Sequence, residues 1–261
     1  MVDEKVVETM RHSVSHILAS AVLEMFPEAK LAIGPAIENG FYYDFDLPRT
    51  LIPEDLPLIE ERMRELIKKD LKFEKAIVPI ETALTEAKKL KQVYKAELIE
   101  ELKKEGEKEV TFYRTGNFTD LCSGPHLAST KEIGAFKLTS IAGAYWKGDE
   151  KNKMLQRIYG VAFATEKELM DYLQIIEEAK KRDHRKLGEE LELFTINDTV
   201  GAGLPIWLPK GATLRRLIRD YLTKKLMESG YQMIETPHIA QSNLWKVSGH
   251  AEFYKDSMYA P

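Results

Sequence analysis

The apolar residues near the start of the chain recur at helical spacing and predict a helix over residues 6–26, which Pro27 ends. Between His12 and Leu23 no residue is formally charged when histidine is counted as neutral. A helix with so few charges is contacted by protein on most of its sides. The stripe that defines its inner face consists of Met10, Val14, Ile17, Leu18, Ala21 and Met25.

The residues that follow alternate between strand-like and helical patterns. Two strand-like runs, 30–37 and 41–45, flank Asn39-Gly40, which favours a hairpin turn. The further elements predicted are helices over 53–69, 81–90 and 96–104 and strands over 73–78, 109–113, 136–146 and 154–164. Helices and antiparallel strands occur in runs without regular βαβ alternation, which predicts an α+β fold with helices packed on antiparallel sheet in two parts.

A long helix over residues 165–190 is predicted next, opened by the capping residue Thr165 with Glu168 three positions later. Beyond it we expect an extended segment over 205–209, an amphipathic helix over 212–229 and a strand over 231–235. This last region is short, and domains of its size are marginally stable. We therefore expect three parts: a domain over residues 1–164, a linker helix over 165–190, and the beginning of a larger domain over 191–261.

Composition narrows the class of protein. The chain has 261 residues, 44% of them hydrophobic and 31% charged, as in a soluble globular protein. A net charge of −4 gives no general attraction to nucleic acid, so any RNA contact must use local clusters such as Lys88, Lys89, Lys91 and residues 180–186. An ordinary solvated helix face explains these clusters equally well. The single cysteine, the absence of a signal-like start and the lack of an uncharged run of membrane-spanning length indicate the cytoplasm and no membrane partner.

Four residues stand out as candidate chemistry. His12 and His16 project from one helix face a turn apart, and Cys122 and His126 repeat the spacing around Gly124-Pro125, which forbids a regular helix and predicts a turn. Two histidines with a cysteine and a third histidine form an ordinary Zn²⁺ ligand set. The same groups also suit metal-free hydrolysis, with imidazoles that position and deprotonate water.

A purely structural explanation competes with this interpretation. An isolated pair of histidines four apart is usually incidental, and a lone cysteine is usually a small buried apolar residue. Here three of the six histidines and the only cysteine fall into two such pairs. Because Ser13 follows His12, the glutamate base of the H-E-x-x-H metalloproteases is missing, which disfavours that class.

The motifs around these residues resemble those of threonyl-tRNA synthetases. The blocks that carry the resemblance are residues 11–16 (RHSVSH), 33–44 (IGPAIENGFYYD), 120–126 (DLCSGPH), 143–149 (GAYWKGD), 152–160 (NKMLQRIYG) and 181–188 (KRDHRKLG). They span nearly the whole chain in the family's order. Alanyl-tRNA synthetases and their free-standing relatives share the paired His and Cys/His core, whereas the CSGPH and GFYYD forms are of the threonyl type.

The resemblance implies an editing domain that hydrolyses Ser-tRNA(Thr). Serine and threonine differ by one methyl group, which allows discrimination of only about 1–3 kcal/mol in one binding step, so a second site must remove the error. The family's pattern implies that His12 and His126 activate water and that Lys95 stabilises developing oxyanion charge. A solvated lysine is the alternative for Lys95. The residues that would complete the pocket are His16, Cys122, Asp120 (an orienting carboxylate) and Tyr43 (a phenol).

Cofactor expectations also follow from the resemblance. Alanyl-type relatives hold zinc with this tetrad, whereas threonyl-type sites are thought to edit without a required metal. We therefore expect no cofactor for editing and keep as the alternative a Zn²⁺ bound by His12, His16, Cys122 and His126.

Residues 204–211 (LPIWLPKG) and 230–237 (GYQMIETP) resemble the opening of a class II catalytic domain, with Pro237 in motif 1, which helps to form the family's homodimer interface. A helix that leads into a strand is the local alternative. ATP, Mg²⁺ and a second zinc would be bound only by the full-length enzyme. We therefore expect a fragment that edits but does not ligate. The alternatives are a stand-alone deacylase acting in trans and a non-catalytic module that binds tRNA or zinc.

Overall fold

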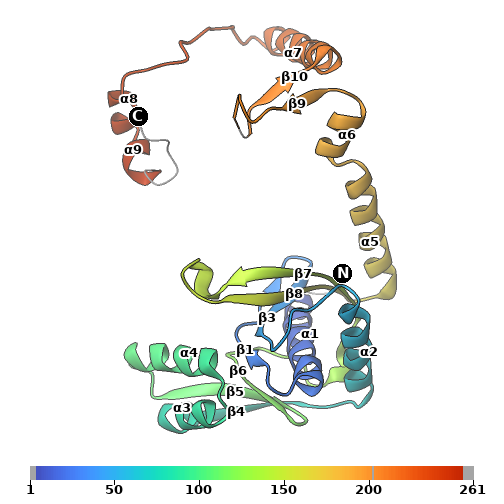
Figure 1. The fold of residues 1–261 in the computed structure, drawn as a ribbon, viewed down its shortest axis with the longest axis vertical. Coiled ribbons are helices and arrows are strands. Elements are labelled where there is room, and N and C mark those ends of the chain that lie inside the picture. Colours follow the sequence, from blue (N-terminus) through green and yellow to red (C-terminus); the bar gives the residue numbers. More distant parts are fainter. Residues whose placement is uncertain (1–3, 202, 255–261) are drawn as a thin grey trace. The chain divides into compact units, whose positions relative to one another are not determined.

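The computed structural model describes residues 4–201 and 203–254 (Figure 1). The chain divides into two compact units, residues 1–178 and residues 179–261. The ends of the first and third predicted domains, residues 1–3 and 255–261, lie outside the described residues.

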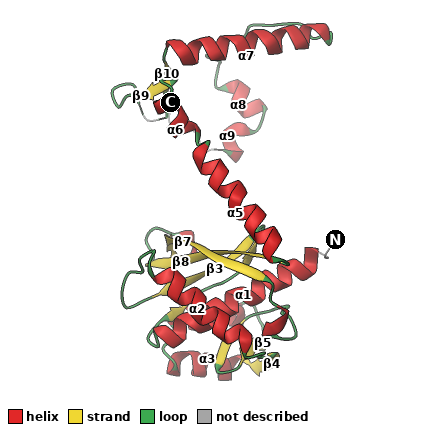
Figure 2. Cartoon of the chain, turned by 90° about the vertical axis from the view of Figure 1, so that its right-hand side faces the viewer, coloured by secondary structure: helices red, strands yellow, loops and turns green. Residues whose placement is uncertain are grey.

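The first unit is built around helix α1 (Glu4–Met25) and a five-stranded antiparallel sheet. Strands run in the order β1 (Lys30–Leu31), β3 (Gly40–Asp46), β8 (Met154–Phe163) and β7 (Ala135–Tyr145), with β2 (Ala36–Ile37) also beside β3. Helices α1 and α2 (Asp55–Lys68) lie against one face of this sheet (Figure 2). The fully buried side chains between the layers include Ile17, Leu18, Phe41, Phe45, Ile59 and Met63.

Gly160 allows the backbone of strand β8 to lie directly against the ring of Phe41. A Cβ atom on Gly160 in β8 would lie 2.4 Å from the ring of Phe41 on the neighbouring strand. That distance is far below van der Waals contact, so a side chain at this position would push Phe41 out of the core.

A second, smaller sheet extends the unit. Strands β4 (Phe73–Pro79), β5 (Glu109–Thr115) and β6 (Phe118–Leu121) are antiparallel in that order. Helices α3 (Ile80–Lys89) and α4 (Val93–Lys104) pack on it through a separate apolar cluster that includes Ile99 and Val110. The α+β class and the two-part arrangement of helices on antiparallel sheet are therefore confirmed.

Helix α5 (Glu166–Lys181) begins in the first unit and crosses the division. Its predicted capping box is present, because the Glu168 amide donates to the Thr165 hydroxyl (3.2 Å) and the Thr165 amide donates to the Glu168 carboxylate (3.1 Å). The described elements of the second unit are α6 (His184–Glu190), β9 (Phe194–Ile196), β10 (Pro205–Trp207), α7 (Pro209–Glu228), α8 (Asn243–Val247) and α9 (His250–Phe253).

Some predicted elements were wrong in detail. The single helix over 165–190 is two helices, because the Asp183 side chain accepts from the Arg185 amide (2.8 Å) and caps a new helix at that point. Residues 231–235 form no strand, since no other strand of the described chain pairs with them. The run 30–37 is interrupted between β1 and β2, and strand β6 was not predicted.

None of the helices in the described ranges combines the length and the apolar character that crossing a bilayer requires.

Candidate active site

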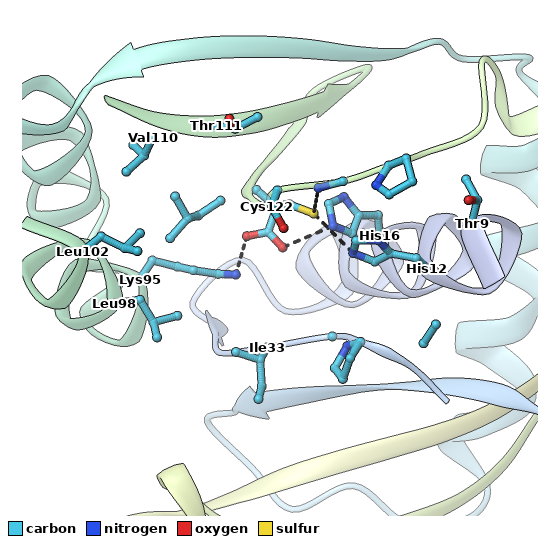
Figure 3. Close-up of a pocket in the computed structure, with 18 of the residues that line it drawn as sticks. Thr9, His12, His16, Ile33, Lys95, Leu98, Leu102, Val110, Thr111 and Cys122 are labelled. Carbon is cyan, nitrogen blue, oxygen red and sulfur yellow. Dashed lines mark hydrogen bonds and ion pairs between the residues drawn. The ribbon is translucent and has the colours of Figure 1, made fainter. Parts of the chain in front are cut away.

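A cavity of about 1130 Å³ lies in the first unit, where the two sheets and helix α1 meet (Figure 3). His12 and His16 reach it from α1, Lys95 from α4, and Asp120 and Cys122 from the end of β6. Its other walls are mixed: the apolar side chains include Ile33, Leu98, Leu102, Val110 and Leu121, and the acidic ones are Glu8, Glu101, Glu105, Glu107 and Glu109. A cavity with apolar walls onto which a few buried polar groups converge is a usual form of ligand site.

Helix α1 places its two histidines by burying itself on nearly every side, as its lack of charge predicted. His16 is 2% exposed and His12 is half-buried. Ser15, which lies between the two histidines, contacts two backbone carbonyls: its hydroxyl donates a hydrogen bond to the carbonyl of His12 (2.8 Å) and lies 2.6 Å from that of Gly34. This second contact ties the part of α1 that carries the histidines to the loop at Gly34.

The segment after β6 carries Cys122 and His126 on a turn, as predicted. Gly124 has a φ of 75°, and a Cβ atom there would lie 2.4 Å from the Tyr113 hydroxyl oxygen. Only glycine adopts this conformation in this space without strain. The Gly124-Pro125 bond is cis. The turn brings the second pair of residues back over α1.

Two of the three histidines of the tetrad contact the sulfur of Cys122, and His16 packs against their rings. The sulfur lies 3.2 Å from His12 Nε2 and 3.3 Å from His126 Nε2. The rings of His16 and His126 are 4.1 Å apart between centroids, and Phe73 stacks on the ring of His126 with centroids 5.1 Å apart. Among the described residues, those that line the cavity include His12, His16 and Cys122 but not His126.

Burial determines the charge state of the tetrad. It lowers the pKa of His12 below 6.5 and that of His16 much further, and together with the neighbouring imidazoles it lowers the pKa of His126 to about 2. Burial also raises the pKa of Cys122 to about 11. At neutral pH the three imidazoles are therefore uncharged bases, and the sulfur is a protonated thiol rather than a nucleophilic thiolate.

A buried ion pair forms the other side of the site. Lys95 Nζ lies 2.6 Å from Asp120 Oδ1, and both side chains are almost completely buried. The Tyr43 hydroxyl donates to Asp120 Oδ2 at 2.5 Å, and burial raises the pKa of Tyr43 well above 10, so the phenol keeps its proton. His16 Nε2 is 3.8 Å from the same carboxylate oxygen. Asp120 thus fixes a single ammonium group at the cavity wall.

The donor atoms of the tetrad fit a metal ion. Each residue offers one ligand atom, and these atoms lie within 4.8 Å of one another. Ligands of a tetrahedral Zn²⁺ with the usual bond lengths lie about 3.3 to 3.8 Å apart, so a small adjustment would complete the shell. His16 Nδ1 is buried without a hydrogen-bond partner among the residues that the structure describes. A cation that accepts this lone pair would satisfy it.

A hairpin outside the cavity holds α4, which carries Lys95. Trp146 Nε1 donates to the Glu97 carboxylate (2.9 Å), and Lys147 Nζ donates to the same group (2.7 Å). Tyr94, next to Lys95, packs its ring against Trp146 with centroids 5.0 Å apart. The block of residues 143–149 therefore has a physical role, because it anchors the helix that supplies the ammonium group.

The sequence-predicted residues fall into two groups. The structure brings His12, His16, Cys122, His126, Lys95, Asp120 and Tyr43 together in the first unit. Pro237 lies in the second unit, exposed and outside any helix or strand. Of the basic residues considered for RNA contact, Lys88 pairs with Glu100 at 2.8 Å on an exposed surface.

Sequence reasoning missed the serines of α1 and the partners of Trp146. Ser13 is fully buried and contacts His126, although it had been considered only as the residue in place of a metalloprotease glutamate. Neither contact leaves a local signal, because each joins segments tens of residues apart. The small uncharged residues between His12 and Leu23 were the available hint.

Comparison with known proteins agrees with the resemblance seen in the motifs. Residues 110–159 match the family described as threonyl and alanyl tRNA synthetase second additional domain. Over 97% of its length the chain is 57% identical to a threonine–tRNA ligase of Dehalococcoides mccartyi and covers 43% of that protein. A threonine–tRNA ligase of Clostridium tetani is 54% identical over 98% of the chain, which covers 40% of the relative.

A third threonine–tRNA ligase, from Citrifermentans bemidjiense, is 56% identical over 97% of the chain, with 39% of the relative covered. The chain thus spans about two fifths of the length of the curated relatives it matches. The matched residues include strand β6, which carries Asp120, and the turn after it, which carries Cys122 and His126. This chain carries the second additional domain of the threonyl and alanyl tRNA synthetases and corresponds, along almost its whole length, to a part of the threonine–tRNA ligases.

Proposed function

We propose that this chain hydrolyses the ester bond of wrongly charged tRNA, with Ser-tRNA(Thr) as its substrate. The observation that carries the proposal is the pair of uncharged imidazoles, His12 and His16, beside a buried ammonium group in one cavity. The similarity to threonine–tRNA ligases supports the choice of tRNA(Thr) as the partner. Residues 1–164 would form the editing domain.

His12 is the proposed general base. It lines the cavity, and its lowered pKa keeps it able to accept a proton at neutral pH. Water attacks the carbonyl carbon of the ester while His12 takes a proton from it. The bond from that carbon to the ribose oxygen then breaks, the ribose oxygen takes the proton from His12, and free serine and tRNA leave. His126, whose Nε2 lies 3.3 Å from the sulfur of Cys122, is proposed to assist in this proton transfer.

Lys95 is proposed to stabilise the negative charge that develops on the carbonyl oxygen during this attack. Its ammonium group is held at the cavity wall by Asp120, which in turn is held by Tyr43. A fixed charge requires no reorganisation at the moment of reaction, which is the main advantage of such a group. Cys122 and His16 would then shape the pocket around the scissile bond.

Catalysis by these residues without a metal is our first choice, and a zinc-dependent variant is the alternative. Held by three of the four residues, Zn²⁺ would keep one position open and supply an activated water there. Chelation with metal analysis separates the two. Retained hydrolysis by metal-free protein supports the first, and loss of activity that Zn²⁺ restores supports the second.

The longer proteins to which this chain corresponds are named threonine–tRNA ligases. We propose that residues 191–261 are part of a class II catalytic domain that binds ATP, Mg²⁺ and a second zinc in the longer protein, with residues 165–190 as the linker. Pro237 would belong to its homodimer interface.

The test is single-turnover deacylation of serine-labelled Ser-tRNA(Thr) by the wild type and by His12→Ala. We expect the substitution to lower the rate about 100-fold or more, because it removes the base. His238→Ala, which alters an exposed histidine of the second unit, is the matched control and should leave the rate unchanged. An intact ester with the wild type, or equal rates for wild type and His12→Ala, would contradict the proposal.

A further inference from the structure

The hydroxyl group of Ser13 lies at a junction between helix α1 and the turn that carries His126. The side chain is fully buried. Its oxygen lies 2.8 Å from the carbonyl oxygen of Thr9, 3.0 Å from the amide nitrogen of Leu127 and 3.1 Å from His126 Nδ1. A serine oxygen has one proton to donate and two lone pairs that accept, so three partners use its full capacity.

The identity of two of the partners determines the third interaction. The Thr9 carbonyl lies nearer to the serine oxygen than His126 Nδ1 does, 2.8 Å against 3.1 Å, and serine hydroxyls within helices commonly donate to the carbonyl four residues earlier, so we assign the serine proton to Thr9. The Leu127 amide can only donate, so it fills one lone pair. The remaining lone pair faces His126 Nδ1, which must therefore carry a proton.

The tautomer of His126 follows from this assignment. An uncharged imidazole has one N–H, so a proton on Nδ1 leaves Nε2 with a free lone pair. Nε2 lies 3.3 Å from the sulfur of Cys122, which in turn lies 3.2 Å from His12 Nε2. Phe73, stacked on His126 with only 4° between the ring planes, restrains the ring orientation. The free lone pair is thus directed at the centre of the tetrad.

We propose that Ser13 is a positioning residue that holds His126 in the tautomer with Nδ1 protonated and Nε2 free. The geometry is independent of the reaction, whereas the consequence for catalysis rests on the proposed function. A base and a metal ligand both need this tautomer, because either role uses the Nε2 lone pair. Without Ser13, the Nδ1 proton loses its acceptor and the proton moves to Nε2, where the sulfur can accept it.

The direct test is the tautomer of His126 in the full chain, read from the ¹⁵N shifts and two-bond ¹H–¹⁵N couplings of the imidazoles, with His126→Asn used for assignment. We expect a protonated Nδ1 and a bare Nε2 in the wild type. Ser13→Ala should move the proton to Nε2. Ser15→Ala is the matched control, because it also removes a fully buried serine of α1 but one that contacts backbone carbonyls, and it should leave the His126 pattern unchanged.

The wild-type spectrum alone can overturn the proposal, even where Ser13→Ala does not fold, because a proton on Nε2 would contradict it. An unchanged tautomer in folded Ser13→Ala would contradict it as well. Ser13→Thr keeps a hydroxyl that can make the same hydrogen bonds and should retain the wild-type pattern.

The kinetic arm uses Ser-tRNA(Thr). Ser13→Ala should lower kcat by about 10- to 100-fold with little change in KM, the usual effect of losing the partner that orients a ligand histidine, and Ser13→Thr should restore most of the loss. A wild type that shows the expected tautomer but leaves the ester intact would refute the proposed function and not the role of Ser13. Normal hydrolysis with a proton on His126 Nε2 would refute the role of Ser13 and not the proposed function.

Discussion

Helices α1 and α7 are of similar length, 22 and 20 residues, yet their apolar residues have opposite environments in the two units. In α1, Ile17 and Leu18 are fully buried beneath the larger sheet. In α7, Leu217 and Leu222 are each 53% exposed. The same helical periodicity therefore predicts a helix in both cases, but only the surrounding layers decide whether it belongs to a core.

Charged groups also have different environments in the two units, and only the buried ones can supply the proposed chemistry. In the first unit, Lys95 and Asp120 are buried together, so their attraction acts in a medium of low polarity. In the second unit, Lys225 and Glu228 pair at 3.0 Å on an exposed surface where water screens them. Burial by the layers packed around α1 likewise lowers the pKa of the three histidines of the tetrad and raises that of Cys122.

The largest expected difference between the units comes from their ion pairs. Lys95→Met should lower the free energy of unfolding by about 3–5 kcal/mol, because it leaves the Asp120 carboxylate buried without its counter-charge. Lys225→Met should lower it by about 1 kcal/mol or less. Urea unfolding followed by circular dichroism measures both. Equal effects would show that the buried pair is not more important than the exposed one.

A slightly smaller difference is expected from the apolar residues. Leu18→Ala should cost about 2–5 kcal/mol, since it removes a fully buried side chain and leaves a cavity. Leu217→Ala removes the same atoms from an exposed position and should change stability by about 0.5 kcal/mol or less. The same unfolding experiment applies. A large loss for Leu217→Ala would indicate that α7 is covered in solution by a surface outside the described residues.

The smallest effect expected from a single residue is the dependence of stability on pH that one buried histidine causes. His12, His16 and His126 have lowered pKa values in the folded chain, so below pH 6.5 the unfolded chain binds protons that the folded chain does not. The stability they contribute is complete above pH 6.5 and is lost as the pH falls below it. Each histidine contributes a slope of up to about 1.4 kcal/mol per pH unit.

Urea unfolding at several pH values between 7 and 5 measures this slope. His16→Asn removes one of the three histidines, so it should reduce the slope by up to about 1.4 kcal/mol per pH unit. Stability that rises as the pH falls through this range would contradict buried, uncharged imidazoles.

The sequence predicted the parts of the first unit that depend on local pattern. Helices α1 and α2 follow from apolar spacing, and the turn at Gly124-Pro125 follows from residues that forbid a helix. The two histidine and cysteine pairs were found by spacing, and the resemblance added Lys95, Asp120 and Tyr43. The ion pair between Lys95 and Asp120 was not predicted, because it depends on how α4 packs against β6.

Other features depended on interactions that a local pattern does not contain. The break at Asp183 depends on a side chain that caps a new helix, within a stretch of uninterrupted helix-forming residues. The strand predicted over 231–235 has suitable residues but lacks a partner strand in the described chain. The position of Ser13 between Thr9, Leu127 and His126 requires the turn after β6 to lie over α1.

The most direct test of the central claim compares deacylation of Ser-tRNA(Thr) and Thr-tRNA(Thr) by the wild-type chain under single-turnover conditions. An editing site must spare the correct product, so we predict that the serine ester is hydrolysed at least about tenfold faster, within the range that one methyl group allows. Equal rates, or faster hydrolysis of the threonine ester, would contradict the assignment of this cavity as an editing site.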